Sequence, residues 1–232
     1  MKQDNKKYMV NNISYDLHEH SLISPLDKET PLFEPKIRLG ILASGNGSNF
    51  EYIIKSIQNN QLNAEISILI VNNPDCLAIK KAIKYKIPYV IINHRNCKSR
   101  LEHDMLVLKK LEELSVELVV MAGWMRIVGE ELVNRYINRL INIHPSLLPS
   151  FKGINAIQQA IDERVTITGC TVHYVKKEVD SGSIIIQAAV PIHEKDNKDT
   201  LTNRIQQMEH VIYPLAIAKV AMKIRTSFKG NK

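Results

Sequence analysis

Two polar residues, Asn142 and His144, have types and spacing suited to carbonyl chemistry. They stand two residues apart in a segment that begins with apolar residues and ends with two prolines. Residues 140–143 predict a short strand, and the prolines beyond it cannot continue a strand ladder. Residues two apart on a strand project to the same face, so an oxygen-binding amide and an imidazole that titrates near neutral pH come together. Such a pair suits a carbonyl that becomes a tetrahedral centre.

Asp180 is the carboxylate that we expect beside His144. It lies in the link between strands predicted at 166–176 and 183–190, directly before Ser-Gly. A carboxylate beside an imidazole favours the protonated ring and raises its pKa, which keeps an acid available at pH 7. Each residue also has a simpler interpretation, His144 as a turn histidine with a backbone partner and Asp180 as an ordinary turn residue. The spacing alone leaves both interpretations open.

A glycine-rich turn containing Gly47, Ser48 and Asn49 follows the strand predicted at 37–43 and precedes a predicted helix. Such a turn presents backbone N–H groups and the positive end of a helix to an anion. The dinucleotide fingerprint would place a third glycine where Phe50 stands, and the Gly-Lys-Ser/Thr of a triphosphate loop is also missing. The turn therefore favours a single phosphate monoester, with a plain helix-capping turn as the alternative.

The rest of the chain alternates strands and helices as a Rossmann-like, mostly parallel sheet of the α/β class requires. The strand at 118–122 is entirely apolar and is expected at the centre of the sheet, and the last two strands are expected to form an antiparallel hairpin. We expect Leu101, Met105, Leu108 and Leu111 to share one face of a helix, and the last helix to be interrupted near Pro214. Strands are predicted at 37–43, 64–71, 89–92, 118–122, 140–143, 166–176 and 183–190, and helices around 53–57, at 76–86, 100–114, 130–136 and 155–162, and from 199 onward.

Ligands of such sheets bind at the carboxyl ends of the strands. The Gly47 turn, the loop around Arg126 and His144 all follow predicted strands there. Trp124 lies beside Arg126, where it suits a flat apolar ligand or simple core packing.

The first 35 residues show no sustained hydrophobic period and predict an arm or a disordered lead-in, followed by one domain at 36–232. His18-Glu19-His20 in this arm has no further ligand nearby, so we assign it no metal and no function. The 31 Lys and Arg exceed the 24 Asp and Glu, which gives a net charge of +7. Because no basic run exceeds two residues, small anionic ligands are favoured over nucleic acid.

Three cysteines, Cys76, Cys97 and Cys170, are too few and too widely spaced for a disulfide framework or a zinc ribbon. We therefore expect a reduced, cytoplasmic protein. No apolar run approaches the roughly 20 residues that span a bilayer, and the N-terminus lacks the apolar core of a secretory signal. No membrane partner is expected.

Five segments together resemble the folate-dependent phosphoribosylglycinamide formyltransferase family of purine synthesis. The likeness extends from about Ile37 to Ile217 and leaves the arm outside. Small departures are Trp124, where the family more often has Phe, Lys176-Lys177, where acidic or polar residues are common, and Met208 in the last segment. The segments are 45–49, 123–127, 142–149, 169–173 with 180–182, and 206–214.

The resemblance implies a formyltransferase fold and transfer of the formyl group of 10-formyltetrahydrofolate, a co-substrate, to the amine of glycinamide ribonucleotide. Asn142 and protonated His144 would stabilise a tetrahedral intermediate, with Asp180 sustaining the protonation, and no metal is required. The resemblance further implies that Gly47, Ser48 and Asn49 bind the phosphate and Gln206 and Glu209 the rest of the ribonucleotide. For the folate it implies Arg100, Met125, Arg126, Ile127, Val128, Asn142, Lys176, Lys177, Glu178, Val179 and Asp180.

Alternatives remain open at this stage. Methionyl-tRNA formyltransferase and formyl-tetrahydrofolate hydrolases share the same Asn, His and Asp, but both are usually longer than this chain and carry an added domain. A phosphate- or RNA-binding α/β module without catalysis is a further possibility, in which Asn142 and His144 would be structural. We expect a monomer or homodimer with no nucleic-acid partner.

Overall fold

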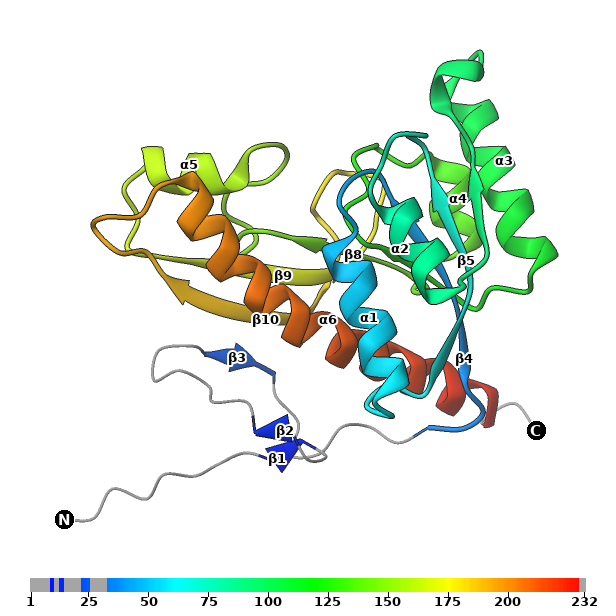
Figure 1. The fold of residues 1–232 in the computed structure, drawn as a ribbon, viewed down its shortest axis with the longest axis horizontal. Coiled ribbons are helices and arrows are strands. Elements are labelled where there is room, and N and C mark those ends of the chain that lie inside the picture. The colour runs from blue at the N-terminus through cyan, green and yellow to red at the C-terminus, as the bar shows by residue number, and fades with distance from the viewer. Residues whose placement is uncertain (1–8, 11–12, 15–21, 26–32, 230–232) are drawn as a thin grey trace.

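One mixed sheet of eight strands organises the chain. The computed structural model describes residues 9–10, 13–14, 22–25 and 33–229. The strand order is β3-β10-β9-β8-β7-β4-β5-β6, and Figure 1 shows β3, β10 and β9 at one end of the fold and β5 at the other. Strands β8, β7, β4, β5 and β6 run parallel, whereas β9, β10 and β3 pair antiparallel to their neighbours. The predicted Rossmann-like sheet with a C-terminal antiparallel hairpin is confirmed.

The elements follow the predicted alternation closely. A two-stranded ladder in the arm, β1 with β2, was not predicted. The strands are β1 (Met9–Val10), β2 (Ile13–Ser14), β3 (Ile23–Ser24), β4 (Ile37–Ala43), β5 (Ala64–Val71), β6 (Tyr89–Ile91), β7 (Leu118–Met121), β8 (Leu140–His144), β9 (Ile167–Tyr174) and β10 (Ile184–Pro191). The helices are α1 (Ser48–Gln58), α2 (Ala78–Tyr85), the short η1 (His94–Asn96), α3 (Arg100–Glu113), α4 (Glu130–Arg135), α5 (Ala156–Asp162) and α6 (Lys198–Lys229).

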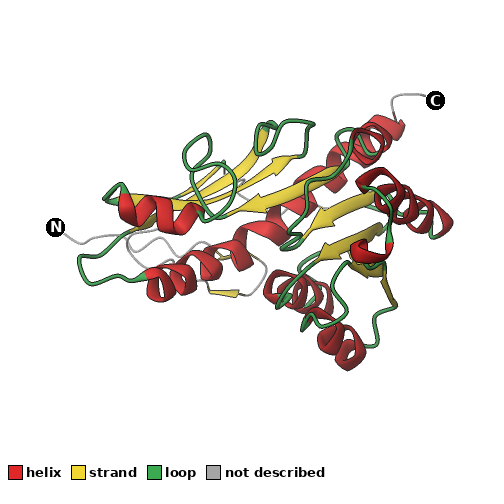
Figure 2. Ribbon diagram, turned by 90° about the horizontal axis from the view of Figure 1, so that it is seen from above, coloured by secondary structure: helices red, strands yellow, loops and turns green. Residues whose placement is uncertain are grey.

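Helices cover both faces of the sheet, which is why its central strands are apolar on both sides (Figure 2). Helices α1, α2 and α6 pack in one hydrophobic core, and α3 and α4 pack in the other. All four residues of β7 are buried between the two cores. The predicted central position of this strand is confirmed.

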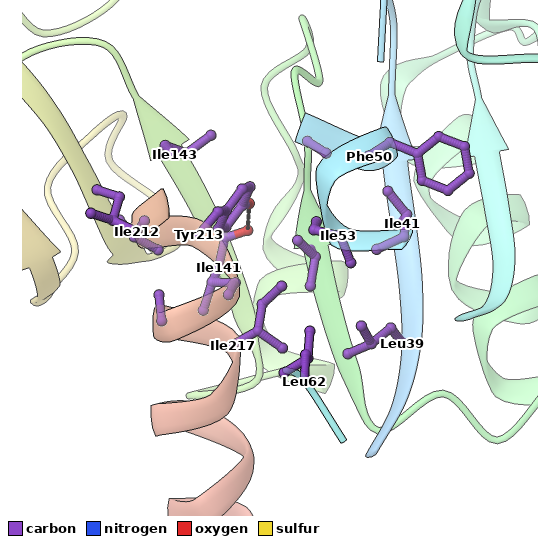
Figure 3. Close-up of a cluster of buried hydrophobic side chains, with 14 of the residues drawn as sticks. Leu39, Ile41, Phe50, Ile53, Leu62, Ile141, Ile143, Ile212, Tyr213 and Ile217 are labelled. Carbon is purple, nitrogen blue, oxygen red and sulfur yellow. Dashed lines mark hydrogen bonds between the residues drawn. The ribbon is translucent and has the colours of Figure 1, made fainter. Parts of the chain in front are cut away.

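Helix α6 runs without interruption through Pro214, so the predicted break is wrong. Proline in a helix interior removes one hydrogen bond and costs about 3 kcal/mol. Here the cost is offset because the flanking residues Ile212, Tyr213, Ala216 and Ile217 are fully buried. Figure 3 shows Tyr213 and Ile217 packed near Ile141 and Leu62, between α6 and the strands. Packing against the sheet therefore holds the helix together across the proline.

The buried face of α3 also differs from the prediction. Leu108 and Leu111 are buried as expected, but Leu101 and Met105 are 54% and 47% exposed. His103 and Asp104 are buried instead, because the imidazole contacts the Ile92 carbonyl at 3.0 Å and the carboxylate accepts the Gly129 N–H at 2.5 Å. Hydrogen-bonded polar residues therefore occupy the buried face of α3 on which Leu101 and Met105 were predicted.

Part of the arm contacts the sheet. Strand β3 pairs with β10 and forms the edge of the sheet, and Phe33 is buried in the α1–α6 core. The division at residue 35 stays a prediction, and His18-Glu19-His20 lies outside the described residues. Among the described helices, none combines the length and the apolar character needed to cross a bilayer.

The buried phenol of Tyr213 provides a test of this packing. Its hydroxyl donates to the Met121 carbonyl at 2.9 Å, which ties α6 to β7. We expect Tyr213→Phe to lower the free energy of unfolding by about 1 kcal/mol, the usual net value of one hydrogen bond. Urea denaturation measures this, with the partly exposed Tyr52→Phe as the matched control. Equal effects of both substitutions would contradict a stabilising role for the hydrogen bond between Tyr213 and Met121.

Candidate active site

Three loops meet at the carboxyl ends of parallel strands. The turn after β4 and the loop after β7 are joined by two hydrogen bonds, from Ser44 N–H to the Gly123 carbonyl and from Met125 N–H to Ser44 Oγ. Strand β8 pairs with β7 and ends at His144, so its last residues lie beside both loops. This is the edge at which the sequence places ligands.

His144 lies between two acceptors. Its Nδ1 is 3.3 Å from Asp180 Oδ2, and its Nε2 is 2.8 Å from the Phe151 carbonyl oxygen. A neutral imidazole has one N–H and one lone pair, so one of these contacts would be unfavourable. A ring with an N–H on each nitrogen would satisfy both acceptors. The structure brings His144 and Asp180 into contact, as the sequence predicts.

Asn142 joins the same cluster through His173, a residue to which sequence reasoning gave no role. Asn142 Nδ2 is 3.4 Å from His173 Nε2, and this nitrogen is 3.6 Å from Asp180 Oδ1. His173 Nδ1 contacts the Tyr174 carbonyl at 2.9 Å. A signal for His173 was present, because it faces the same side as Thr171 in the predicted strand. The catalytic trio of the prediction thus forms one cluster with a second histidine.

The carboxylate of Asp180 is held ionised by its neighbours. Burial alone would raise its pKa, but the hydrogen bond with His173, the Gly153 N–H and the charge of His144 together lower the pKa of Asp180 below its ordinary value. Asp180 has a left-handed backbone with φ 49°. Gly182 two residues later is required, since a Cβ there would lie 1.5 Å from the Tyr174 carbonyl oxygen.

The turn before α1 has the geometry of an anion site. Gly47 has φ 67° and precedes Ser48, the first residue of the helix. A Cβ on Gly47 would lie 2.8 Å from Ala78 Cβ, so both its conformation and its packing require glycine. The free N–H groups at this helix end suit an anion.

Glu209 of α6 contacts this turn through Asn49. Asn49 Nδ2 donates to Glu209 Oε2 at 2.8 Å, which links two predicted ribonucleotide residues that are 160 positions apart. Burial raises the pKa of Glu209 to about 7, although the Asn49 bond opposes the shift. Asn49 Oδ1 is buried without a partner among the described residues. Gln206 lies one turn before Glu209 on α6 and is half-buried.

Apart from Arg100 and Asn142, the predicted folate residues come from two segments that lie together. Lys177 Nζ is 3.1 Å from Glu130 Oε2, so the link after β9 reaches the end of the loop after β7. Within this region Met125 is 80% exposed, and Ile127 and Val179 are also exposed. Of the others, Val128 is buried, Arg126 is half-buried with its Nε unpartnered in the described structure, and Lys176, Glu178 and Arg100 are exposed.

No hydrogen bond or ion pair among the described residues joins Arg100 to the other predicted site residues. Arg100 is the first residue of α3 and lies directly after the helix-capping Ser99. Within the described ranges, no group of three or more His, Cys, Asp or Glu side chains is arranged to hold a metal ion. The cluster therefore offers acid, amide and carboxylate groups for acyl chemistry.

The chain is similar to known proteins in both sequence and structure. Residues 37–217 match the family model described as formyl transferase. Phosphoribosylglycinamide formyltransferase of Bacillus subtilis is 37% identical over 79% of this chain and 94% of its own length. The crystal structure of phosphoribosylglycinamide formyltransferase from Bacillus halodurans superposes with a TM-score of 0.77, at 42% identity, over 79% of this chain and 94% of that chain.

Larger relatives contain a matching part. The trifunctional purine biosynthetic protein adenosine-3 of Homo sapiens is 44% identical over 80% of this chain. The chain spans 18% of the length of that relative. The matched segment, 37–217, contains all the predicted site residues and excludes the arm.

Glu209 gives a testable pH dependence. Because its pKa is raised to about 7 in the folded chain and is near 4.5 when exposed, the unfolded state loses this proton first. Stability is therefore lost as pH rises from about 4.5 to about 7. We expect Glu209→Gln to gain stability over the natural chain across this range, by a few kcal/mol at most, since one pKa unit is worth about 1.4 kcal/mol. Urea denaturation at pH 5 and pH 8 measures the difference, and a pH-independent difference would contradict the shift.

Proposed function

The chain belongs to the formyl transferase family, and from that premise we propose that it transfers the formyl group of 10-formyltetrahydrofolate to the amine of glycinamide ribonucleotide. The observation that carries the proposal is the imidazole of His144, held between Asp180 Oδ2 and the Phe151 carbonyl at the end of β8. This places an acid beside the amide of Asn142. The proposed overall activity is that of phosphoribosylglycinamide formyltransferase, a step of purine synthesis.

The proposed mechanism uses Asn142, His144 and Asp180. Attack of the substrate amine on the formyl carbon forms a new C–N bond and makes that carbon tetrahedral, with negative charge on its oxygen. Collapse of this intermediate breaks the bond to the folate nitrogen, which leaves with the proton that the amine gives up. Protonated His144 donates to that oxygen, and so does Asn142, whose amide has a second N–H besides the one that faces His173. Asp180 keeps the imidazole charged and oriented. The Phe151 carbonyl must yield its place to the substrate oxygen, because it accepts the Nε2 proton in this structure.

The proposed phosphate site is the turn of Gly47, Ser48 and Asn49. The N–H groups at the start of α1 supply donors for phosphate oxygens. Gln206 and Glu209 then bind the ribose and glycinamide end of the ribonucleotide. The Asn49–Glu209 hydrogen bond supports this assignment, because it joins the phosphate turn to α6.

The proposed folate site is the pair of loops at 125–128 and 176–180, with Arg100 beyond them. Its exposed apolar side chains, Met125, Ile127 and Val179, fit a flat ring system. The predicted cations Arg100, Lys176 and Lys177 fit the carboxylates of a folate tail. The co-substrate supplies the formyl group and no metal takes part.

Other folate-using activities are the competing proposals. Methionyl-tRNA formyltransferase and formyl-tetrahydrofolate hydrolase use the same three side-chain types, and a phosphate- or RNA-binding module uses none of them for catalysis. The Bacillus subtilis relative, matched over 94% of its length, supports the ribonucleotide as acceptor. We propose a monomer or homodimer without a nucleic-acid partner. The free thiols of Cys76, Cys97 and Cys170 support a cytoplasmic location.

His144→Ala tests the proposed activity. We expect it to lower kcat by on the order of a hundred- to thousandfold, the usual loss when one oxyanion donor is removed. A folate absorbance assay with glycinamide ribonucleotide measures turnover, and the exposed His193→Ala is the control. His173→Ala does not serve as a control because His173 contacts Asp180.

The same assay decides between the competing functions. Deformylation of the folate without the ribonucleotide acceptor would indicate a hydrolase. Salt-sensitive retention of RNA without any turnover would indicate the binding module and overturn the proposed function.

A further inference from the structure

A single row of paired residues crosses four strands from His144 to the arm. His144 of β8 is opposite Thr171 of β9, Thr171 is opposite Gln187 of β10, and Gln187 is opposite Ser24 of β3. Residues opposite each other in antiparallel strands have their side chains about 5 Å apart. The arm is therefore in register with the residue that ends β8.

Gln187 uses both of its N–H donors on this row. Its Nε2 donates to the Leu148 carbonyl at 3.0 Å and to Thr171 Oγ1 at 2.9 Å. Thr171 Oγ1 in turn accepts the Leu148 N–H at 3.1 Å and donates to the Ser146 carbonyl at 2.7 Å. Both backbone groups of Leu148 are thus held by two side chains from neighbouring strands.

These hydrogen bonds hold the loop that leaves His144. Ser146 Oγ also donates to the Ser150 carbonyl at 2.5 Å, and the loop continues to Phe151, whose carbonyl contacts His144 Nε2. A shift of Leu148 would therefore move both ends of the loop that surrounds the imidazole. Gln187 therefore supports that loop and does not itself contact the imidazole.

The arm strand fixes β10 from the other side. Ala189 N–H donates to the Leu22 carbonyl at 2.8 Å, and Lys219 Nζ of α6 donates to the Pro25 carbonyl at 2.9 Å. Ile23 is buried with 9% exposure, whereas its neighbour Leu22 is 69% exposed. Strand β3 therefore turns β10 from an edge strand into an interior one along the row of Gln187.

We propose that Gln187 is a positioning residue for His144 and that the arm strand β3 completes its support by fixing β10. The inference rests on the proposed function for its catalytic readout. The arm lies outside residues 37–217, the segment that matches the family. The proposed support therefore extends beyond the matched segment.

Gln187→Met tests the first part, because methionine has a similar length and no donor. We expect kcat to fall about tenfold with KM for both substrates nearly unchanged, since misplacement by about 1 Å costs up to a hundredfold. Gln158→Met on the surface of α5, where the amide bonds Asp162, is the matched control. Hydrogen exchange at the Leu148 amide should rise about tenfold in the Gln187 variant, in step with the loss in kcat.

Ile23→Asp and Leu22→Asp test the second part as a matched pair in the full chain. Aspartate at the buried position should release β3 and lower kcat several-fold, whereas aspartate at the exposed position should leave kcat unchanged. In the double variant Ile23→Asp with Gln187→Met, the two losses should combine to less than their product, because they act through one support. Circular dichroism confirms that each variant is folded.

The outcomes separate this inference from the proposed function. If the natural chain turns over no formyl donor, the function fails, and Leu148 amide exchange alone then decides the inference. Unchanged Leu148 exchange and unchanged kcat in Gln187→Met overturn the positioning role. Fully multiplicative losses in the double variant, or equal kcat for the Ile23 and Leu22 variants, overturn the part assigned to the arm.

Discussion

The contact between His144 and Asp180 is the constraint on which the rest of the site depends. Strand β9 runs antiparallel to β8, so it leads away from His144 and ends at the level of Ile141. The link after β9 must therefore fold back across the sheet to bring Asp180 Oδ2 within 3.3 Å of the imidazole. The Gly153 N–H, which donates to Asp180 at 2.8 Å, holds it there. Gly182 permits the fold-back because any larger residue would collide with the Tyr174 carbonyl.

The pKa values of two carboxyl groups in the candidate site are shifted in opposite directions. The pKa of Asp180 is lowered because two histidines and a backbone N–H outweigh its burial. The pKa of Glu209 is raised to about 7 because the Asn49 amide alone does not outweigh burial. Environment, not residue type, sets the charge of each group. The consequence is an ionised carboxylate beside the imidazole and an acid about half protonated at pH 7 beside the turn that suits phosphate, where a full second anion would repel the ligand.

Sequence patterns predicted the sheet well because its central strands are continuous apolar runs and its turns contain Gly or Pro. The failures share one physical cause, which is that tertiary contacts overrode a local rule. Burial of His103 and Asp104 became favourable because the Ile92 carbonyl contacts the imidazole and the Gly129 N–H donates to the carboxylate, and this rotated the buried face of α3. Burial on both sides carried α6 through Pro214.

For the site, spacing on β8 predicted the pairing of Asn142 with His144, but only the β8–β9 register brings His173 to the same place. A strand as short as β3 has no period to detect, and its pairing partner is more than 160 residues away.

The register of β10 also explains why a glutamine can support the loop after His144. A β-bulge lies between Ile184 and Ile186, where β10 contributes one residue more than β9. Because side chains alternate between the two faces of a sheet, a shift of one residue reverses every side chain beyond it. Without the bulge, Ile186 would stand opposite Thr171 and Gln187 would point to the other face. The extra residue therefore aims the amide of Gln187 at Leu148, and it places Ser24 of the arm on the same row as His144.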